Sequence, residues 1–247
     1  MWQTSWRRKD IFNELKHTSL DKMRERERKE RIMDNANMSD IENSMTFHHH
    51  FCESRLTQGP EVWNAYTSFL VSLVPCFFPK PHHLEFQQFA WMLMLNGPCS
   101  FYYHYHLTWL GKHLDETTMF LANYYLICGL SRFYKQKQRY FYILANSALL
   151  PFYLTFNVFP QNDVYFPFLY TSYCTFTCAL LLDIAVKNKC RVSMARNLAL
   201  TTFGASCWIL SEAFCDETTV FGHVLWHLFF PLGIYRVVKM LDRMLII

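Results

Sequence analysis

The sequence predicts an all-α protein, an integral membrane bundle of seven transmembrane helices (residues 51–247) behind a polar N-terminal tail (residues 1–50). Three observations lead to this prediction. Of the 247 residues, 51% are hydrophobic and 18% are aromatic. The tail is densely charged with both signs, which is typical of disorder or a partly helical, solvated segment. From Glu61 onward, apolar runs of roughly 16–22 residues follow one another, close to the length that crosses ~30 Å of hydrocarbon.

Each transmembrane span is predicted from an apolar run and the breakers that bound it. The spans are, in order, 61–78, 84–108, 117–134, 140–156, 165–186, 194–214 and 220–240. Prolines lie at several boundaries, at Pro79, Pro81 and Pro160, as expected of residues that end helices. Pro98 and Pro231 fall inside the second and seventh spans, where membrane helices tolerate them. The connections are short, so we expect neighbouring helices to be antiparallel.

Basic residues gather in alternate connections. One face of the bundle carries Lys80, Arg132, Lys135, Lys137, Arg139, Lys187, Lys189, Arg191, Arg196, Arg236, Lys239 and Arg243. The opposite face has only Arg55 and Lys112, and its last two loops have none. Because lysine and arginine in short loops stay cytosolic, the C-terminus is predicted to be cytosolic and the N-terminus lumenal. The basic run at 22–31 lies about 30 residues before the first span, beyond the window in which such charges count.

The composition excludes some classes of function. A formal net charge of +4 is too small to indicate a nucleic-acid partner, and nothing in the sequence predicts a protein partner. The nine cysteines lack CxxC spacing, which excludes a cysteine zinc module. Cys52 and Cys215 lie outside the apolar runs and would form a disulfide if both faced an oxidising lumen. Asn37 begins the only Asn-x-Ser/Thr sequon, a candidate glycosylation site in the lumenal tail.

Two histidines stand inside the most C-terminal apolar run. His223 and His227 are four residues apart, so both imidazoles lie on one face of a helix. Titratable groups at membrane depth are costly and usually functional. Paired histidines on one helix face are also how zinc enzymes supply two ligands. A hydrogen-bonded interior role and a proton relay in a transporter are the alternatives. A transporter would be expected to show repeated halves, and no repeat is evident.

A second polar group precedes and opens the third span. Ser100 and His104 are also four residues apart, and Asp115 is predicted to stand at the mouth of the third helix, whose N-terminus favours a carboxylate. Taken singly, Ser100 is typical of helix packing and Asp115 of a cap. The predicted topology brings the end of the second span and the starts of the third and seventh to one membrane face. There, three histidines with an open fourth position would be typical of catalytic zinc.

The combined spacing resembles a known family. Ser100-x3-His104-x10-Asp115, and His223-x2-Trp226-His227 in the last span, are similar to the pattern of the alkaline ceramidases. These are seven-span zinc amidases in a superfamily that includes the adiponectin and progestin receptors. The resemblance runs from about Phe51 to the C-terminus.

The resemblance implies a reaction and a site. His104, His223 and His227 would hold Zn²⁺, Asp115 would orient or deprotonate the zinc-bound water, and Ser100 would hold that water or the developing oxyanion. Ceramide, entering from the bilayer, would be hydrolysed to sphingosine and a fatty acid. The expected location is the endoplasmic reticulum or Golgi membrane.

The sequence departs from the family at a second, calcium-binding motif. Glu53 and Glu61 remain as candidate Ca²⁺ ligands, but His50 and Arg55 stand where the family has Asp and Asn. Calcium requires several oxygen ligands, and a neighbouring cation opposes it. Two other functions stay open: a hydrolase of the same fold acting on another lipid, and a non-enzymatic, receptor-like protein with a residual metal site. Ser100 and Asp115 at hydrolase spacing favour an enzyme.

Overall fold

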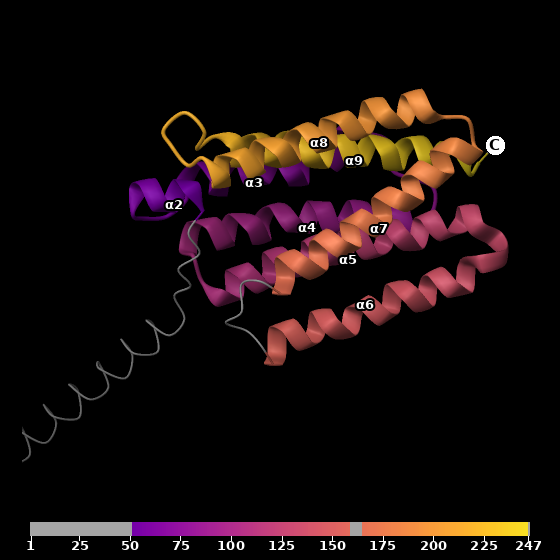
Figure 1. The fold of residues 1–247 in the computed structure, drawn as a ribbon, viewed down its shortest axis with the longest axis horizontal. Coiled ribbons are helices and arrows are strands. Elements are labelled where there is room, and N and C mark those ends of the chain that lie inside the picture. The colour runs from indigo at the N-terminus through magenta and orange to yellow at the C-terminus, as the bar shows by residue number, and fades with distance from the viewer. Residues whose placement is uncertain (1–50, 159–164, 247) are drawn as a thin grey trace, which may run out of the picture. The chain divides into compact units, whose positions relative to one another are not determined.

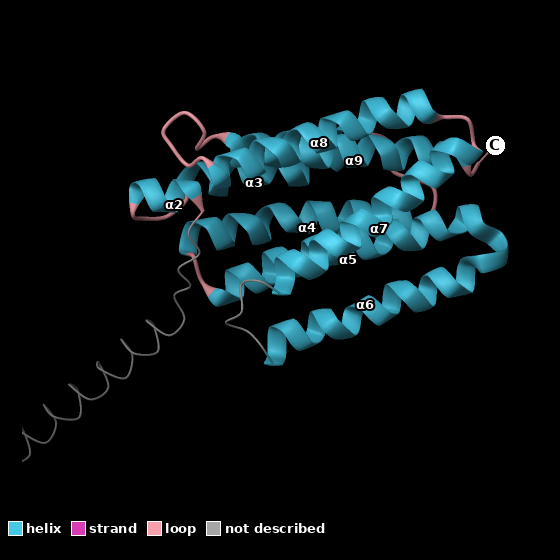
Figure 2. Cartoon of the chain, viewed as in Figure 1, coloured by secondary structure: helices cyan, strands magenta, loops and turns pink. Residues whose placement is uncertain are grey.

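A computed structural model describes residues 51–246 with the exception of 159–164. The predicted tail and the sequon at Asn37 lie outside the described residues. The described part is helical without a strand (Figure 2). Its α-helices are α2 (Cys52–Thr57), α3 (Val62–Leu73), α4 (Leu84–His106), α5 (Trp109–Leu130), α6 (Gln138–Val158), α7 (Tyr165–Lys187), α8 (Arg191–Ala213) and α9 (Gly222–Met244). Two 3-10 segments, η1 (Val74–Phe77) and η2 (Ser131–Lys137), continue α3 and α5. The predicted all-α fold, with seven helices after α2, is confirmed.

The helices pack mainly as antiparallel neighbours, as the short connections predict (Figure 1). The most extensive contacts are those of α8 with α9 and of α4 with α5, and α3 contacts both α4 and α9. The close approach of α8 to α9 depends on Gly204, where a Cβ atom would lie 2.7 Å from the backbone nitrogen of Phe230. Helix α6 lies at the edge of the bundle, against α5 and α7.

The start of α5 differs from the prediction. The helix begins at Trp109 rather than at Thr117. Leu107 adopts a left-handed conformation (φ 48°) that ends α4, and the Thr108 hydroxyl then accepts the Gly111 N–H at 3.2 Å and caps α5. Gly111 permits this turn, because a Cβ there would lie 2.7 Å from Cα of Tyr103. The prediction placed Lys112 in the connection before the third span, but the cap places residues 111–113 in the first turns of the helix.

Two of the described helices are long and apolar enough to cross a membrane by length and composition alone. They are Phe168–Lys187 in α7 and Gly222–Met244 in α9, and the apolar run Val62–Phe77 is shorter. Membrane crossing by these two helices, as by the others, stays a prediction.

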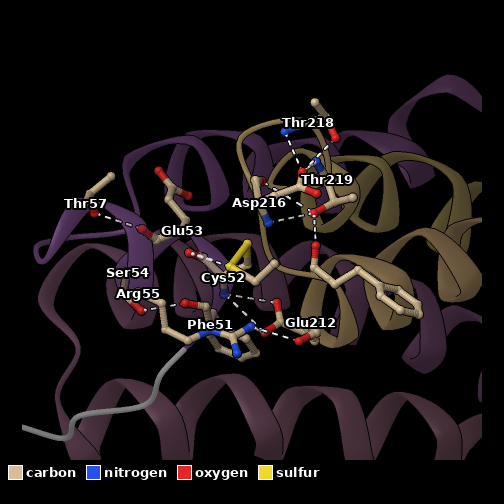
Figure 3. Close-up of a disulfide and its surroundings, with 12 residues drawn as sticks. Phe51, Cys52, Glu53, Ser54, Arg55, Thr57, Glu212, Asp216, Thr218 and Thr219 are labelled. Atoms are coloured by element: carbon tan, nitrogen blue, oxygen red, sulfur yellow. Dashed lines mark hydrogen bonds and ion pairs between the residues drawn. A yellow bond between two sulfur atoms is a disulfide. The ribbon is translucent and has the colours of Figure 1, made fainter.

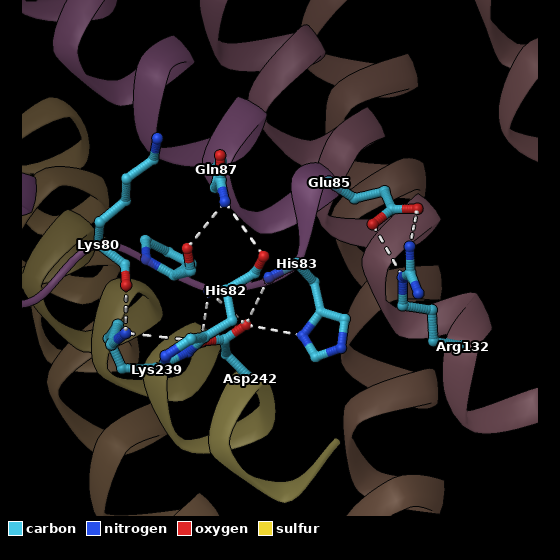
Figure 4. Close-up of polar contacts among 9 residues, drawn as sticks. Lys80, His82, His83, Glu85, Gln87, Arg132, Lys239 and Asp242 are labelled. Atoms are coloured by element: carbon cyan, nitrogen blue, oxygen red, sulfur yellow. Dashed lines mark hydrogen bonds and ion pairs between the residues drawn. The ribbon is translucent and has the colours of Figure 1, made fainter. Parts of the chain in front are cut away.

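The end of the bundle where α9 finishes is held by a buried carboxylate, that of Asp242 (Figure 4). Its oxygens accept the backbone N–H groups of His82 and His83 at 2.9–3.1 Å. The Nδ1 atoms of the same two histidines lie 3.0 and 2.9 Å away, and Lys239 Nζ is 3.6 Å away. Nearby, Arg132 forms a two-point ion pair with Glu85. Asp242 thus links α9 to the connection between α3 and α4.

Candidate active site

Three imidazoles converge at the opposite end of the bundle. His104 lies in the last turn of α4, and His223 and His227 lie in the first two turns of α9. Their ring centroids are 4.8 to 5.5 Å apart, and one ring nitrogen from each residue lies within 4.8 Å of the others. All three side chains are at most 5% exposed. Three imidazole nitrogens at one buried point form a ligand set that suits zinc.

Two neighbours orient these rings. His104 Nδ1 lies 2.5 Å from Glu61 Oε2, and His227 Nδ1 lies 3.1 Å from the Thr67 hydroxyl. A histidine that donates its Nδ1–H to a carboxylate keeps the lone pair of Nε2 for a metal. Glu61 directly precedes α3 and Thr67 lies within it, and α3 packs on α4 and α9. The sequence did not single out Thr67, because the contact joins residues 160 positions apart.

Asp115 and Ser100 lie beside the histidines on α5 and α4. Asp115 is 8% exposed and Ser100 is 2% exposed, and the two side chains are within hydrogen-bonding reach. Ser68 also donates to the Ser100 hydroxyl oxygen at 3.1 Å. The prediction that Asp115 stands at the mouth of a helix is wrong, because α5 begins six positions earlier, at Trp109. Asp115 therefore gains nothing from the free N–H groups of the first turn.

Asn96 supplies the hydrogen bond that a helix terminus would otherwise give. Its Nδ2 donates to Asp115 Oδ1 at 2.8 Å and lies 2.9 Å from the Thr118 hydroxyl. Asn96, Ser100 and His104 are spaced four apart, so they lie along one face of α4. Sequence reasoning missed the role of Asn96, although this spacing was a signal for it.

A cavity of about 250 Å³ joins these groups. The three histidines, Ser100 and Asp115 all line it. The rest of its wall is largely apolar and includes Phe89, Leu93, Leu126, Phe166, Leu181 and Leu198. An apolar chamber with polar groups gathered in one part is typical of a small-molecule site.

Phe51 packs against two of the three histidines. Its ring centroid lies 4.8 Å from that of His223 and 5.4 Å from that of His104, and its side chain lines the cavity. Phe51 directly precedes α2, and the structure joins α2 to the loop after α8 by a disulfide between Cys52 and Cys215 (Figure 3). The location of α2 thus decides how well the histidines are shielded from water.

The candidate calcium ligands are both buried, but their oxygens are mostly engaged. The two carboxylate oxygens of Glu53 accept the backbone N–H groups of Trp63 and Asn64, at 2.7 and 2.9 Å. Burial raises the pKa of Glu53, and these hydrogen bonds oppose the rise. Glu61 Oε2 contacts His104. Among the side-chain oxygens of Glu53, Glu61 and Asn64, two have no hydrogen-bond partner within the described residues: Glu61 Oε1 and Asn64 Oδ1. With three of the four carboxylate oxygens already in polar contacts, and with the positive charge of Arg55 where the motif has an asparagine, the donor set suits calcium poorly.

Comparison with known proteins identifies the family. A family model described as Ceramidase matches residues 44–246. No curated protein matches the chain.

Proposed function

The chain belongs to the ceramidase family, and on that premise we propose that it is a membrane-embedded zinc amidohydrolase. Its reaction would be hydrolysis of the N-acyl bond of ceramide to sphingosine and a fatty acid. The observation that carries the proposal is the convergence of His104, His223 and His227, with one ring nitrogen of each within 4.8 Å of the others, in a cavity that Asp115 also lines.

The histidines would hold the metal, and their surroundings fit it. The Glu61 carboxylate at His104 Nδ1 is an acceptor of the kind that commonly orients zinc-binding histidines. A bound zinc ion would supply Lewis acidity and would lower the pKa of a water molecule to roughly 7.

Asp115 is the residue placed to accept a proton from the attacking water. Asn96 donates to one of its oxygens and the Ser100 hydroxyl lies within hydrogen-bonding reach, so the carboxylate is held beside the histidines, where it would take the proton. Addition of water places its oxygen on the acyl carbon, the C–N bond breaks, and the amine leaves with the proton that Asp115 took up. The Ser100 hydroxyl, one turn before His104, is placed to stabilise the oxyanion that develops on the amide oxygen.

The surroundings of the site favour a lipid substrate. The cavity wall beyond the polar groups is apolar, which suits hydrocarbon chains. The outer surface also carries large exposed apolar side chains on several helices: Trp91, Leu150, Phe168 and Ile209 are 55 to 67% exposed. Apolar surface spread over several helices is typical of contact with a membrane. Ceramide would reach the cavity from that membrane.

We further propose a lumenal N-terminus and a cytosolic C-terminus, in the endoplasmic reticulum or Golgi membrane. The basic loops support this orientation, and so does the Cys52–Cys215 disulfide at the other end of the bundle, because disulfides persist on the oxidising side. Protease treatment of sealed microsomes tests it. The N-terminal tail should be protected and the C-terminus accessible, and cleavage of the tail from outside would reject the orientation.

The first experiment measures zinc and ceramide hydrolysis in one detergent-purified sample. Wild type should contain about one zinc per chain and release sphingosine. His227→Ala should lose both, whereas His106→Ala, an exposed histidine two residues beyond His104, should lose neither. Zinc without hydrolysis would redirect the search to acyl esters, phospholipids or a receptor role. Absence of zinc from the wild type would refute the proposal.

A further inference from the structure

Helix α2 is attached to α8 through one carboxylate, that of Glu212 near the end of α8 (Figure 3). Glu212 accepts the backbone N–H of Cys52 at 3.1 Å. The Arg55 guanidinium donates to the same carboxylate at 3.1 Å and to the backbone carbonyl of Glu212 at 2.9 Å. Glu212 therefore holds both ends of α2, the first residue through its backbone and the last turn through a cation.

This attachment bears on the candidate active site. Phe51, the residue before α2, packs on His104 and His223 and lines the cavity. A shift of α2 away from α8 would move Phe51 and open the histidines to water. The contacts of Glu212 with α2 consequently hold Phe51 against His104 and His223.

The family resemblance implies that a calcium ion lies beside this segment, but the residues present here do not fit one. Glu53 uses both of its carboxylate oxygens on backbone N–H groups. The position that the motif gives to an asparagine ligand is Arg55, which brings a positive charge of its own. Hydrogen bonds between a guanidinium and a carboxylate are stronger than neutral ones, so such a pair can hold a segment in place without a bound ion.

We propose that the Arg55–Glu212 ion pair replaces calcium in this chain and holds α2, and with it Phe51, against His104 and His223. Arg55 and Glu212 are positioning residues, because they act on the site through α2. The proposal rests on the proposed function only for the identity of the site that α2 covers. Calcium uptake, unfolding temperature and zinc release are measured without substrate, so its failure is distinguishable from failure of the amidase proposal.

Calcium binding is the first test, made on the full-length, zinc-loaded protein in detergent. After removal of free calcium, addition of millimolar calcium chloride should leave the unfolding temperature unchanged, and elemental analysis should find far less than one calcium per chain. Uptake of one calcium per chain, or a calcium-dependent rise in the unfolding temperature, would overturn the proposal.

A double-mutant cycle then tests the ion pair. Arg55→Asn and Glu212→Gln should each lower the unfolding temperature by a few degrees. The double variant should lower it little further, because both changes remove one shared interaction. Arg55→Lys, which keeps the charge, should restore part of the loss. Arg132→Ala is the matched control, since it breaks the ion pair with Glu85 at the other end of the bundle. Additive effects of Arg55→Asn and Glu212→Gln would overturn the proposal.

Zinc release to a chelator reports on the cover itself. The disulfide tethers the same segment, so the comparison is made in a Cys215→Ser background. There, Arg55→Asn should release zinc several-fold faster, whereas Arg132→Ala should release it at the rate of the background. Equal rates for both variants would show that Arg55 stabilises the fold without positioning α2, contrary to the proposal.

Discussion

Histidines and a buried carboxylate meet at each end of the bundle, but the two groups are built in opposite ways. At the end where α9 starts, three rings converge, and the carboxylate of Glu61 lies behind one of them, at His104 Nδ1. At the end where α9 finishes, the carboxylate of Asp242 is the centre. The backbones and rings of His82 and His83 surround it.

The difference indicates what would distinguish a group that can hold a metal from a structural cluster of the same residue types. Donors already surround both oxygens of Asp242, and its histidines point their Nδ1 atoms at the carboxylate, so that carboxylate has little capacity left for an ion. At the other end, Glu61 contacts Nδ1 of His104, and one ring nitrogen from each of the three histidines lies within 4.8 Å of the others. We therefore expect the position of the carboxylate, behind the rings or between them, to decide whether the histidines can bind a metal.

Removing one histidine from each end gives the largest expected contrast. His223→Ala should abolish both zinc binding and ceramide hydrolysis, because two ligands cannot retain the metal of a three-histidine site. His83→Ala should keep about one zinc per chain and near-normal turnover. Zinc content and sphingosine release, measured on folded protein, decide the matter. Retained activity in His223→Ala would show that the three rings are a structural cluster like that around Asp242.

A substitution at Asp115 tests the chemical step separately from metal binding. Asp115→Asn should keep its zinc but lower kcat about 10²–10⁴-fold, the usual contribution of a general base. Its packing and the contact with Asn96 can persist, because an amide has nearly the same shape. Ser147→Ala, an exposed site on α6, is a suitable control and should leave kcat unchanged. Full activity in Asp115→Asn would show that Asp115 is not the residue that accepts the proton.

The comparison of the two ends predicts that the Glu61 carboxylate contributes to zinc affinity. Glu61→Gln removes the negative charge at His104 and should weaken zinc affinity by about 10–100-fold, as is usual for a partner of a metal-binding histidine. Thr67→Val, which removes a neutral contact to His227, should have a smaller effect. Competition with a chromogenic chelator measures both affinities. Unchanged affinity in Glu61→Gln, with a lower unfolding temperature, would assign Glu61 a structural role.

The sequence predicted the parts of the candidate active site that depend on local spacing. His223 and His227, and likewise Ser100 and His104, share a helix face because each pair is four residues apart, and short connections placed these helix ends together. The start of α5 was mispredicted because the turn chemistry at Leu107 and Thr108 outweighed a polar stretch that reads as a loop.

Contacts between distant segments were beyond sequence reasoning. Thr67 reaches His227, and Asp242 reaches His82, across about 160 residues, and no periodic pattern marks either pair. The Arg55–Glu212 pair is of the same kind. Its two charges are visible in the sequence, but the partner of each depends on how α2 packs on α8. Helix faces follow from spacing, whereas the groups that orient them depend on the tertiary packing.

The smallest expected effect is that of a substitution of Asp242, at the end of the bundle where α9 finishes. Asp242→Asn leaves a neutral amide among the donors of His82, His83 and Lys239, and part of these donors must turn away or stay unpaired. We expect a loss of about 1–3 kcal/mol in the free energy of unfolding, the cost of an unsatisfied buried group. Zinc content and kcat should not change, because the carboxylate holds the α3–α4 connection at the end of the bundle away from the imidazoles. Thermal unfolding measured beside zinc content checks both parts, and loss of zinc from the folded variant would mean that the two ends are coupled through α9.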